Sequence, residues 1–188
     1  MQDIYNRVAK WNSLRYEQEY DAQLTHTLLV EEYSEWIQAP DQVNDIKELA
    51  DIVYVALGAL WKLDVNDEEA QASAALFLEG LLNQSELMPG FFVGALLDQN
   101  AVVYAEDQVK LMHNIIGCAL AQMQCIGLGQ HHCVAVLNAV CDSNDTKTVK
   151  KTASDVKAND KDKGHYYRPA EPKIRLIMET AKCLSKTH

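Results

Sequence analysis

Apolar residues recur at the spacing of an α-helix in the first third of the chain, and breaks in the pattern predict three helices. The first covers residues 2–14, and its apolar positions are Ile4, Val8, Trp11 and Leu14. The apolar positions of the second are Leu24, Leu28, Tyr33, Trp36 and Ile37. It ends at Ala-Pro-Asp, residues 39–41, because the residue before a proline is biased away from the helical conformation. The third runs over residues 43–63, and so short a connection makes it an antiparallel neighbour of the second.

Helical patterns also dominate the remainder of the chain. The predicted segments are a helix over 68–82 capped by Asn66-Asp67, a turn over 83–90, a short buried segment over 91–97, and helices over 105–125, 132–141 and 172–184. The strand-like run AVVY, residues 101–104, is too short to propose a sheet. The predicted fold class is therefore all-α, a helical bundle that contains a helix hairpin.

The composition changes at Cys141. Residues 142–163 are rich in Lys, Asp, Asn and Thr and have almost no large apolar side chains. Such a segment lacks the apolar surface needed to pack into a core, so we expect a polar surface loop. We predict a single domain over residues 1–188, with this loop extending over residues 142–171.

Length and charge narrow the class of protein. The 188 residues are 48% hydrophobic and 23% charged, which is typical of one globular domain. A formal net charge of −10 argues against nucleic acid or an anionic membrane as a partner. The five cysteines form no CxxC pair, so we expect reduced thiols in a cytoplasmic protein. The N-terminus has no apolar signal core, and no run is long enough to span a bilayer.

The candidate chemistry lies in the stretch EEYSEWIQAPDQVNDIKELAD, residues 31–51. Its acids form two groups at helical spacing: Glu31, Glu32 and Glu35, then Glu48 and Asp51. Residues three or four apart share one face of a helix, so each group projects together. The acids interrupt apolar faces, where a carboxylate is costly to desolvate unless positive charge meets it. Lys47 is the only Lys or Arg in the stretch, so Mg²⁺ or Mn²⁺ is the natural counter-charge. The alternative is two solvated helix faces.

The pattern Glu31-Glu32-x-x-Glu35 followed by Glu48-x-x-Asp51 resembles the signature of the MazG-like all-α nucleoside triphosphate pyrophosphohydrolases. Residues 8–12 ahead of the motif, and Tyr54 after it, support this resemblance. A second match lies downstream, where Ser143-Asn144-x-x-Lys147 and Lys163-Gly164 followed by Pro169 resemble elements of phage- and integron-type members. Residues 67–130 carry no motif that we recognise.

The resemblance implies Mg²⁺-dependent hydrolysis of a nucleoside triphosphate to the monophosphate and pyrophosphate. A deoxynucleotide is the expected substrate, with dGTP, dUTP and dCTP all open. The acids that resemble the metal ligands are Glu32, Glu35, Glu48 and Asp51, with Glu31 as an extra acid that binds a further metal or orients the attacking water. Two or three Mg²⁺ ions per site are implied, and Mn²⁺ can substitute. Glu31 and Glu35 are the candidate catalytic residues.

The polar loop is expected to supply the cations and to close over the site. Lys147, Lys163 and Arg168 are the candidates for binding phosphates, with Asn144 as a hydrogen-bonding partner and Tyr166 or Tyr167 covering the site. The alternative for any one of these lysines is that it is a solvent-exposed residue of a surface loop and binds no substrate. Tyr54 is a candidate lining residue. Trp11 is a candidate for stacking on the base and Asn12 for hydrogen-bonding its edge, although the spacing of Trp11 fits a core residue equally well.

Two classes of function remain open at this point. One is the enzyme just described, with a small nucleotide as its partner and neither nucleic acid nor membrane. The other is a non-catalytic helical module that binds nucleotide or protein and holds a structural ion. The resemblance also implies a homodimer or a dimer of dimers, unless residues 67–130 cover the apolar helix faces within one chain.

Overall fold

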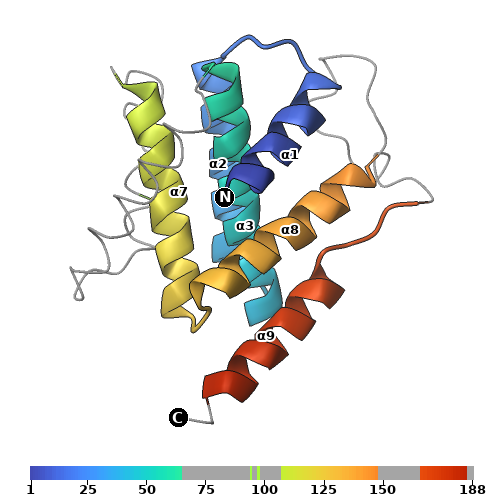
Figure 1. Cartoon of the computed structure of the whole chain (residues 1–188). Coiled ribbons are helices and arrows are strands. Elements are labelled where there is room, and N and C mark those ends of the chain that lie inside the picture. Colours follow the sequence, from blue (N-terminus) through green and yellow to red (C-terminus); the bar gives the residue numbers. More distant parts are fainter. Residues whose placement is uncertain (65–93, 95–96, 98–106, 148–165, 186–188) are drawn as a thin grey trace.

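A computed structural model describes residues 1–64, 94, 97, 107–147 and 166–185 of the chain (Figure 1). The helices in these ranges are, in order, α1 (Gln2–Ser13), α2 (Ala22–Ile37), α3 (Gln42–Lys62), α7 (Gln108–Cys125), α8 (Gln130–Asp145) and α9 (Glu171–Ser185). All of the regular secondary structure in the described ranges is helical, which confirms the all-α fold class.

Aspartates fix where three of the helices begin. The side chain of Asp21 accepts a hydrogen bond from the backbone N–H of Leu24, and Asp107 does the same for Lys110. Asp41, directly after Pro40, accepts from the N–H groups of both Val43 and Asn44. Each cap satisfies backbone donors that have no partner within the helix. The break predicted at residues 39–41 thus becomes a tight α2–α3 connection.

Helix α3 is the centre of the bundle. It contacts α1, α2, α7, α8 and α9, and Figure 1 shows it between α7 on one side and α1 and α8 on the other. Ile46, Leu49, Ile52 and Val53 are all completely buried, so the helix is covered on most of its circumference. Gly58 lets α1 approach closely, because a Cβ atom at this position would lie 3.2 Å from the amide nitrogen of Asn12.

Helix α8 is longer than the sequence pattern predicts. It continues past residue 141 to Asp145, so the first four residues of the predicted polar loop are helical. The reason is a set of partners distant in sequence: Arg7 of α1 donates to the carboxylates of Asp142 and Asp145 at 2.7 Å, and Lys173 of α9 also donates to Asp142 at 2.7 Å. These bonds hold polar residues on a helix that contacts both α1 and α9 and lies between them in Figure 1.

Several predicted segments lie outside the described residues. They are the helix over 68–82, the turn over 83–90, the run at 101–104 and nearly all of the segment 91–97, of which Gly94 is helical and Leu97 is buried. The described cysteines, Cys118, Cys125, Cys133 and Cys141, are free thiols.

No single helix in the described ranges has the length and apolar character that a membrane span requires. Helices α7 and α8 meet that requirement only as a pair bent by 115°.

Candidate active site

A pocket of about 390 Å³ joins the two parts of the chain that the sequence motifs single out. Its described lining comes from α2, α3, the C-terminal end of α8 and the residues that lead into α9. The lining residues are Glu32, Glu35, Lys47, Glu48, Asp51, Val140, Ser143, Asn144, Lys147, Tyr167, Ala170 and Glu171. Four of the five predicted acids therefore share one pocket with Asn144 and Lys147, about a hundred residues further along the chain.

The acids converge across the α2–α3 hairpin. Carboxylate oxygens of Glu32 on α2 and of Glu48 and Asp51 on α3 all lie within 4.8 Å of one another. Glu48 and Asp51 are three residues apart and share one face of α3, while the tight connection at Asp41 brings α2 alongside. Three carboxylate oxygens at this separation fit a hard divalent cation such as Mg²⁺ or Mn²⁺, which prefers oxygen ligands. Glu35 lines the same pocket from an exposed position.

Lys47 supplies positive charge that the sequence interpretation did not expect. Its ammonium donates to both carboxylate oxygens of Glu48 at 2.9 Å and to one of Asp51 at 2.8 Å. The three side chains are only 19%, 10% and 17% exposed, respectively. The signal was present in the sequence, because Lys47 and Asp51 have the i,i+4 spacing of a helical ion pair. The acids thus have an internal counter-ion as well as a geometry suited to metal.

Burial dominates the protonation of the acids. It raises the pKa of Glu32 to about 8, helped by repulsion from Asp51, Glu35 and Glu48. Burial also raises the pKa of Glu48, to about 6, although the neighbouring Lys47 opposes the rise. For Lys47, burial by itself would lower the pKa, but Asp51 and Glu48 outweigh it and the net pKa is raised. In the metal-free protein near neutral pH, the cluster therefore holds a proton on Glu32 and a positive charge on Lys47.

Helix α1 and Arg15, two residues after it, brace Asn144 at the end of α8 and Lys147, two residues beyond that helix. The indole N–H of Trp11 donates to the backbone carbonyl of Asn144 at 2.8 Å. The guanidinium of Arg15 lies over the Trp11 ring, 4.1 Å from its centroid, and donates to the backbone carbonyl of Lys147 at 3.2 Å. Carbonyls at the C-terminal end of a helix have no helical partner, so these donors fix the end of α8. Asn144 is only 4% exposed.

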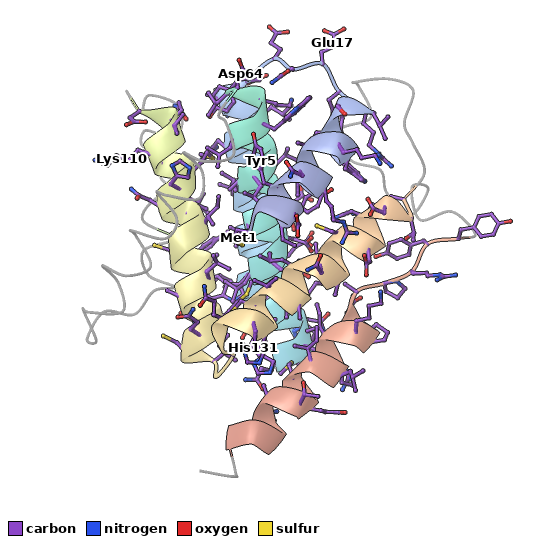
Figure 2. The ribbon with its side chains drawn as sticks, in the orientation of Figure 1. Met1, Tyr5, Glu17, Asp64, Lys110 and His131 are labelled. Carbon is purple, nitrogen blue, oxygen red and sulfur yellow. The ribbon has the colours of Figure 1, made fainter. Side chains whose placement is uncertain are left out.

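The residues predicted to recognise the base or line its site, Trp11, Asn12 and Tyr54, make contacts within the protein. Asn12 is buried, and its amide donates to the backbone carbonyl of Val8 at 2.9 Å. The ring of Tyr54 meets that of Trp11 edge-on, with centroids 5.8 Å apart. None of these three side chains belongs to the described lining of the pocket, and a role in base recognition stays a prediction. Figure 2 shows how side chains fill the space between α1, α3 and α8.

The remaining predicted residues take varied positions. Glu31 is half-buried on α2 and lies outside the described lining of the pocket. Tyr167 lines the pocket, whereas Tyr166 is 82% exposed. Arg168 is exposed, and its backbone N–H donates to the hydroxyl of Thr146 at 3.0 Å. Lys163 lies outside the described residues. The sequence interpretation missed Ser143, Val140, Ala170 and Glu171 as lining residues.

An all-α bundle with converging carboxylates is the kind of site that can hold a divalent cation. Comparison with known families narrows the class of protein further. Residues 3–74 match the family model of phosphoribosyl-ATP pyrophosphohydrolase, a family of the MazG-like all-α NTP pyrophosphohydrolase superfamily. The match covers α1, α2, α3 and every acid of the motif. The matched family is one of pyrophosphohydrolases that act on nucleotide-like small molecules and typically depend on a divalent metal. No curated protein and no solved structure matches the chain.

The raised pKa of Glu32 predicts proton release when a metal binds. A protonated carboxyl must ionise to become a ligand, so Mn²⁺ binding at pH 7 should release about one proton per site. At pH 9, above the folded pKa of about 8, the release should approach zero. Calorimetric titrations in two buffers of different ionisation enthalpy measure the number of protons. Glu32→Gln should abolish the release, and an equal release at pH 7 and pH 9 would contradict the prediction.

Trp11→Phe tests whether Trp11 braces the end of α8 or stacks on the base of a bound nucleotide. The substitution keeps an aromatic ring but removes the N–H donor to Asn144, so it should cost about 1 kcal/mol in the free energy of unfolding. If Trp11 braces α8, the KM of nucleotide substrates with a purine base and of those with a pyrimidine base should rise by the same factor. A rise for one class of base alone would indicate stacking on the substrate. Trp61→Phe, at the C-terminal end of α3, is the matched control.

Proposed function

We propose that this protein hydrolyses a (deoxy)nucleoside triphosphate between the α and β phosphates, with a divalent cation, to give the monophosphate and pyrophosphate. The observation that carries the proposal is the single pocket that holds Glu32, Glu48 and Asp51 together with Lys147. Acids alone would repel a polyphosphate, and a lysine alone would bind any anion. A pocket that offers cation ligands and a phosphate-binding ammonium suits a nucleotide bound as its metal complex.

Each group has a distinct part in the proposed reaction. Glu32, Glu48 and Asp51 would hold the metal, with Glu35 completing its ligands or accepting the proton of the attacking water. The bound metal neutralises phosphate charge and lowers the pKa of water. Lys147 and Asn144 would bind and orient the phosphate chain, and Tyr167 would cover it. Glu31 remains a second candidate for orienting the water, and Lys163 and Arg168 for binding phosphates as the polar loop closes.

The substrate class rests on two sources that agree on the bond cleaved. The downstream Asn144 and Lys147 elements resemble phage- and integron-type members, which favours a dNTP such as dGTP, dUTP or dCTP and a cytoplasmic role. The matched family is named for phosphoribosyl-ATP, which places that molecule beside the dNTPs in the substrate panel. Both are nucleotides with a phosphoanhydride bond between the α and β phosphates, the bond that the acid cluster would address.

The direct test is incubation with this panel and Mg²⁺ or Mn²⁺, followed by identification of the phosphate product. Pyrophosphate is expected. Glu35→Gln and Asp51→Asn should each lower kcat by about 10²-fold or more, because each removes a metal ligand or a proton acceptor. Glu17→Gln is the control, since Glu17 is exposed between α1 and α2 (Figure 2) and lies outside the described lining of the pocket. Release of orthophosphate, or activity that survives both variants, would overturn the proposal.

The second candidate is a non-catalytic helical module that binds nucleotide or protein. It is favoured by one observation, the contact of Lys47 with Glu48 and Asp51, which balances charge without any metal. Calorimetry with Mn²⁺ separates the enzyme from a module whose acids hold only a structural ion, and the hydrolysis assay separates it from a module that binds nucleotide without cleaving it. The enzyme should bind Mn²⁺ more tightly in the presence of a non-hydrolysable triphosphate, whereas a structural ion site should bind it equally with and without that ligand.

The proposed assembly is a homodimer or a dimer of dimers with active sites near the interface. Ile37 and Leu176 are exposed apolar residues on α2 and α9, at 61% and 62% respectively, and are candidates for burial by a second copy. Light scattering at micromolar concentration should give at least twice the mass of one chain. A monomeric mass would instead favour cover of the apolar faces by residues 67–130 of the same chain.

A further inference from the structure

Lys47 occupies the position that a cation ligated by Glu48 and Asp51 would take. Its ammonium lies 2.9 Å from both carboxylate oxygens of Glu48 and 2.8 Å from one of Asp51. Glu48 and Asp51 also belong to the group whose oxygens approach within 4.8 Å of one another. Lys47 therefore competes with a metal for the same ligand atoms.

An ammonium and a divalent cation repel each other when they share ligands at contact distance, and a half-buried pocket screens that repulsion poorly. Binding of a metal to Glu48 and Asp51 must therefore displace the ammonium of Lys47. The backbone of Lys47 is fixed in the buried helix α3, but its side chain has four rotatable bonds and three donors. It can leave the carboxylates without any rearrangement of the helix.

The pocket also determines where the ammonium can go. Lys47 and Lys147 both line it, from α3 and from the residues just after α8 respectively. Tyr167 and Asn144 belong to the same lining and carry polar groups suited to an anion. A displaced Lys47 that stays within this pocket would lie among the groups proposed to bind the phosphate chain.

We propose that Lys47 is an internal counter-ion with two positions: on Glu48 and Asp51 before the metal binds, and on the substrate phosphates afterwards. The inference rests on the proposed function. In the metal-free protein, Lys47 offsets the repulsion that would separate the acids. In the loaded site, the same positive charge adds to the attraction for a polyphosphate.

If Lys47 has these two positions, a single substitution should strengthen the binding of Mn²⁺ alone and weaken the binding of the triphosphate. Lys47→Met keeps the apolar stem but removes the charge that competes for the carboxylates, so the dissociation constant for Mn²⁺ alone should fall about tenfold. At saturating Mn²⁺, the dissociation constant for a non-hydrolysable triphosphate should rise at least about tenfold, because a charged hydrogen bond is lost. Calorimetry measures both constants. Lys110→Met, at an exposed position on α7, is the matched control and should change neither (Figure 2).

Lys47→Arg tests whether the charge itself is responsible. It should restore triphosphate affinity at saturating Mn²⁺ to within a few-fold of the original, since the cation is kept, whereas Mn²⁺ alone should bind no more tightly than to the original protein. A purely structural ion pair gives a different result. In that case Lys47→Met would lower the midpoint of thermal unfolding, leave Mn²⁺ affinity unchanged or weaker, and leave triphosphate affinity unchanged.

A measurement on the unaltered sequence covers the case in which Lys47→Met does not fold. The ammonium ¹⁵N resonance of Lys47, assigned with Lys47→Arg, should shift on addition of Mg²⁺ and shift again on addition of the triphosphate analogue. A resonance unmoved at saturating Mg²⁺ would overturn the inference. The hydrolysis assay decides the proposed function separately. A protein that binds Mn²⁺, shows the Lys47 effects and cleaves no nucleotide would refute only the assignment of the reaction.

Discussion

The burial of carboxylates on the central helix is the constraint on which the rest of the structure depends. Glu48 and Asp51 lie on a helix that five other helices cover, where an unpaired charge is unstable. Positive charge must therefore be close to them. Lys47 provides it from the same helix, and its ammonium contacts carboxylate oxygens that a bound cation would also use. The requirements of folding and of metal binding are thus met by the same few atoms.

The second half of the pocket depends on α1, although no α1 side chain belongs to its described lining. Arg7 holds Asp142 and Asp145, while Trp11 and Arg15 donate to the carbonyls of Asn144 and Lys147. These contacts fix the last turn of α8 against α1, which itself packs on α3. The region that matches the known family, residues 3–74, therefore positions the downstream residues that the match does not include.

The sequence predicted what depends on local spacing. Helical periodicity predicted the described helices, with ends correct to within a few residues, and the i,i+3 spacing of Glu48 and Asp51 predicted their common direction. The end of α8 was wrong because its stability comes from Arg7, more than 130 residues away. The hydrogen bond from Trp11 could not be predicted, because its acceptor is a backbone carbonyl and every residue has one. The spacing of Lys47 was visible, but its meaning required knowing that the acids are buried.

Charge balance imposes an order on the proposed reaction. The described lining of the pocket contains five carboxyl groups, those of Glu32, Glu35, Glu48, Asp51 and Glu171, against the ammonium groups of Lys47 and Lys147. The chain as a whole carries a net charge of −10. A triphosphate would meet net negative charge in this pocket unless cations were already present or arrived with it. The metal must therefore precede or accompany the nucleotide, and each cation bound to the acids also frees Lys47 from them. In the proposed reaction, metal binding and phosphate binding would be coupled because both depend on the same lysine.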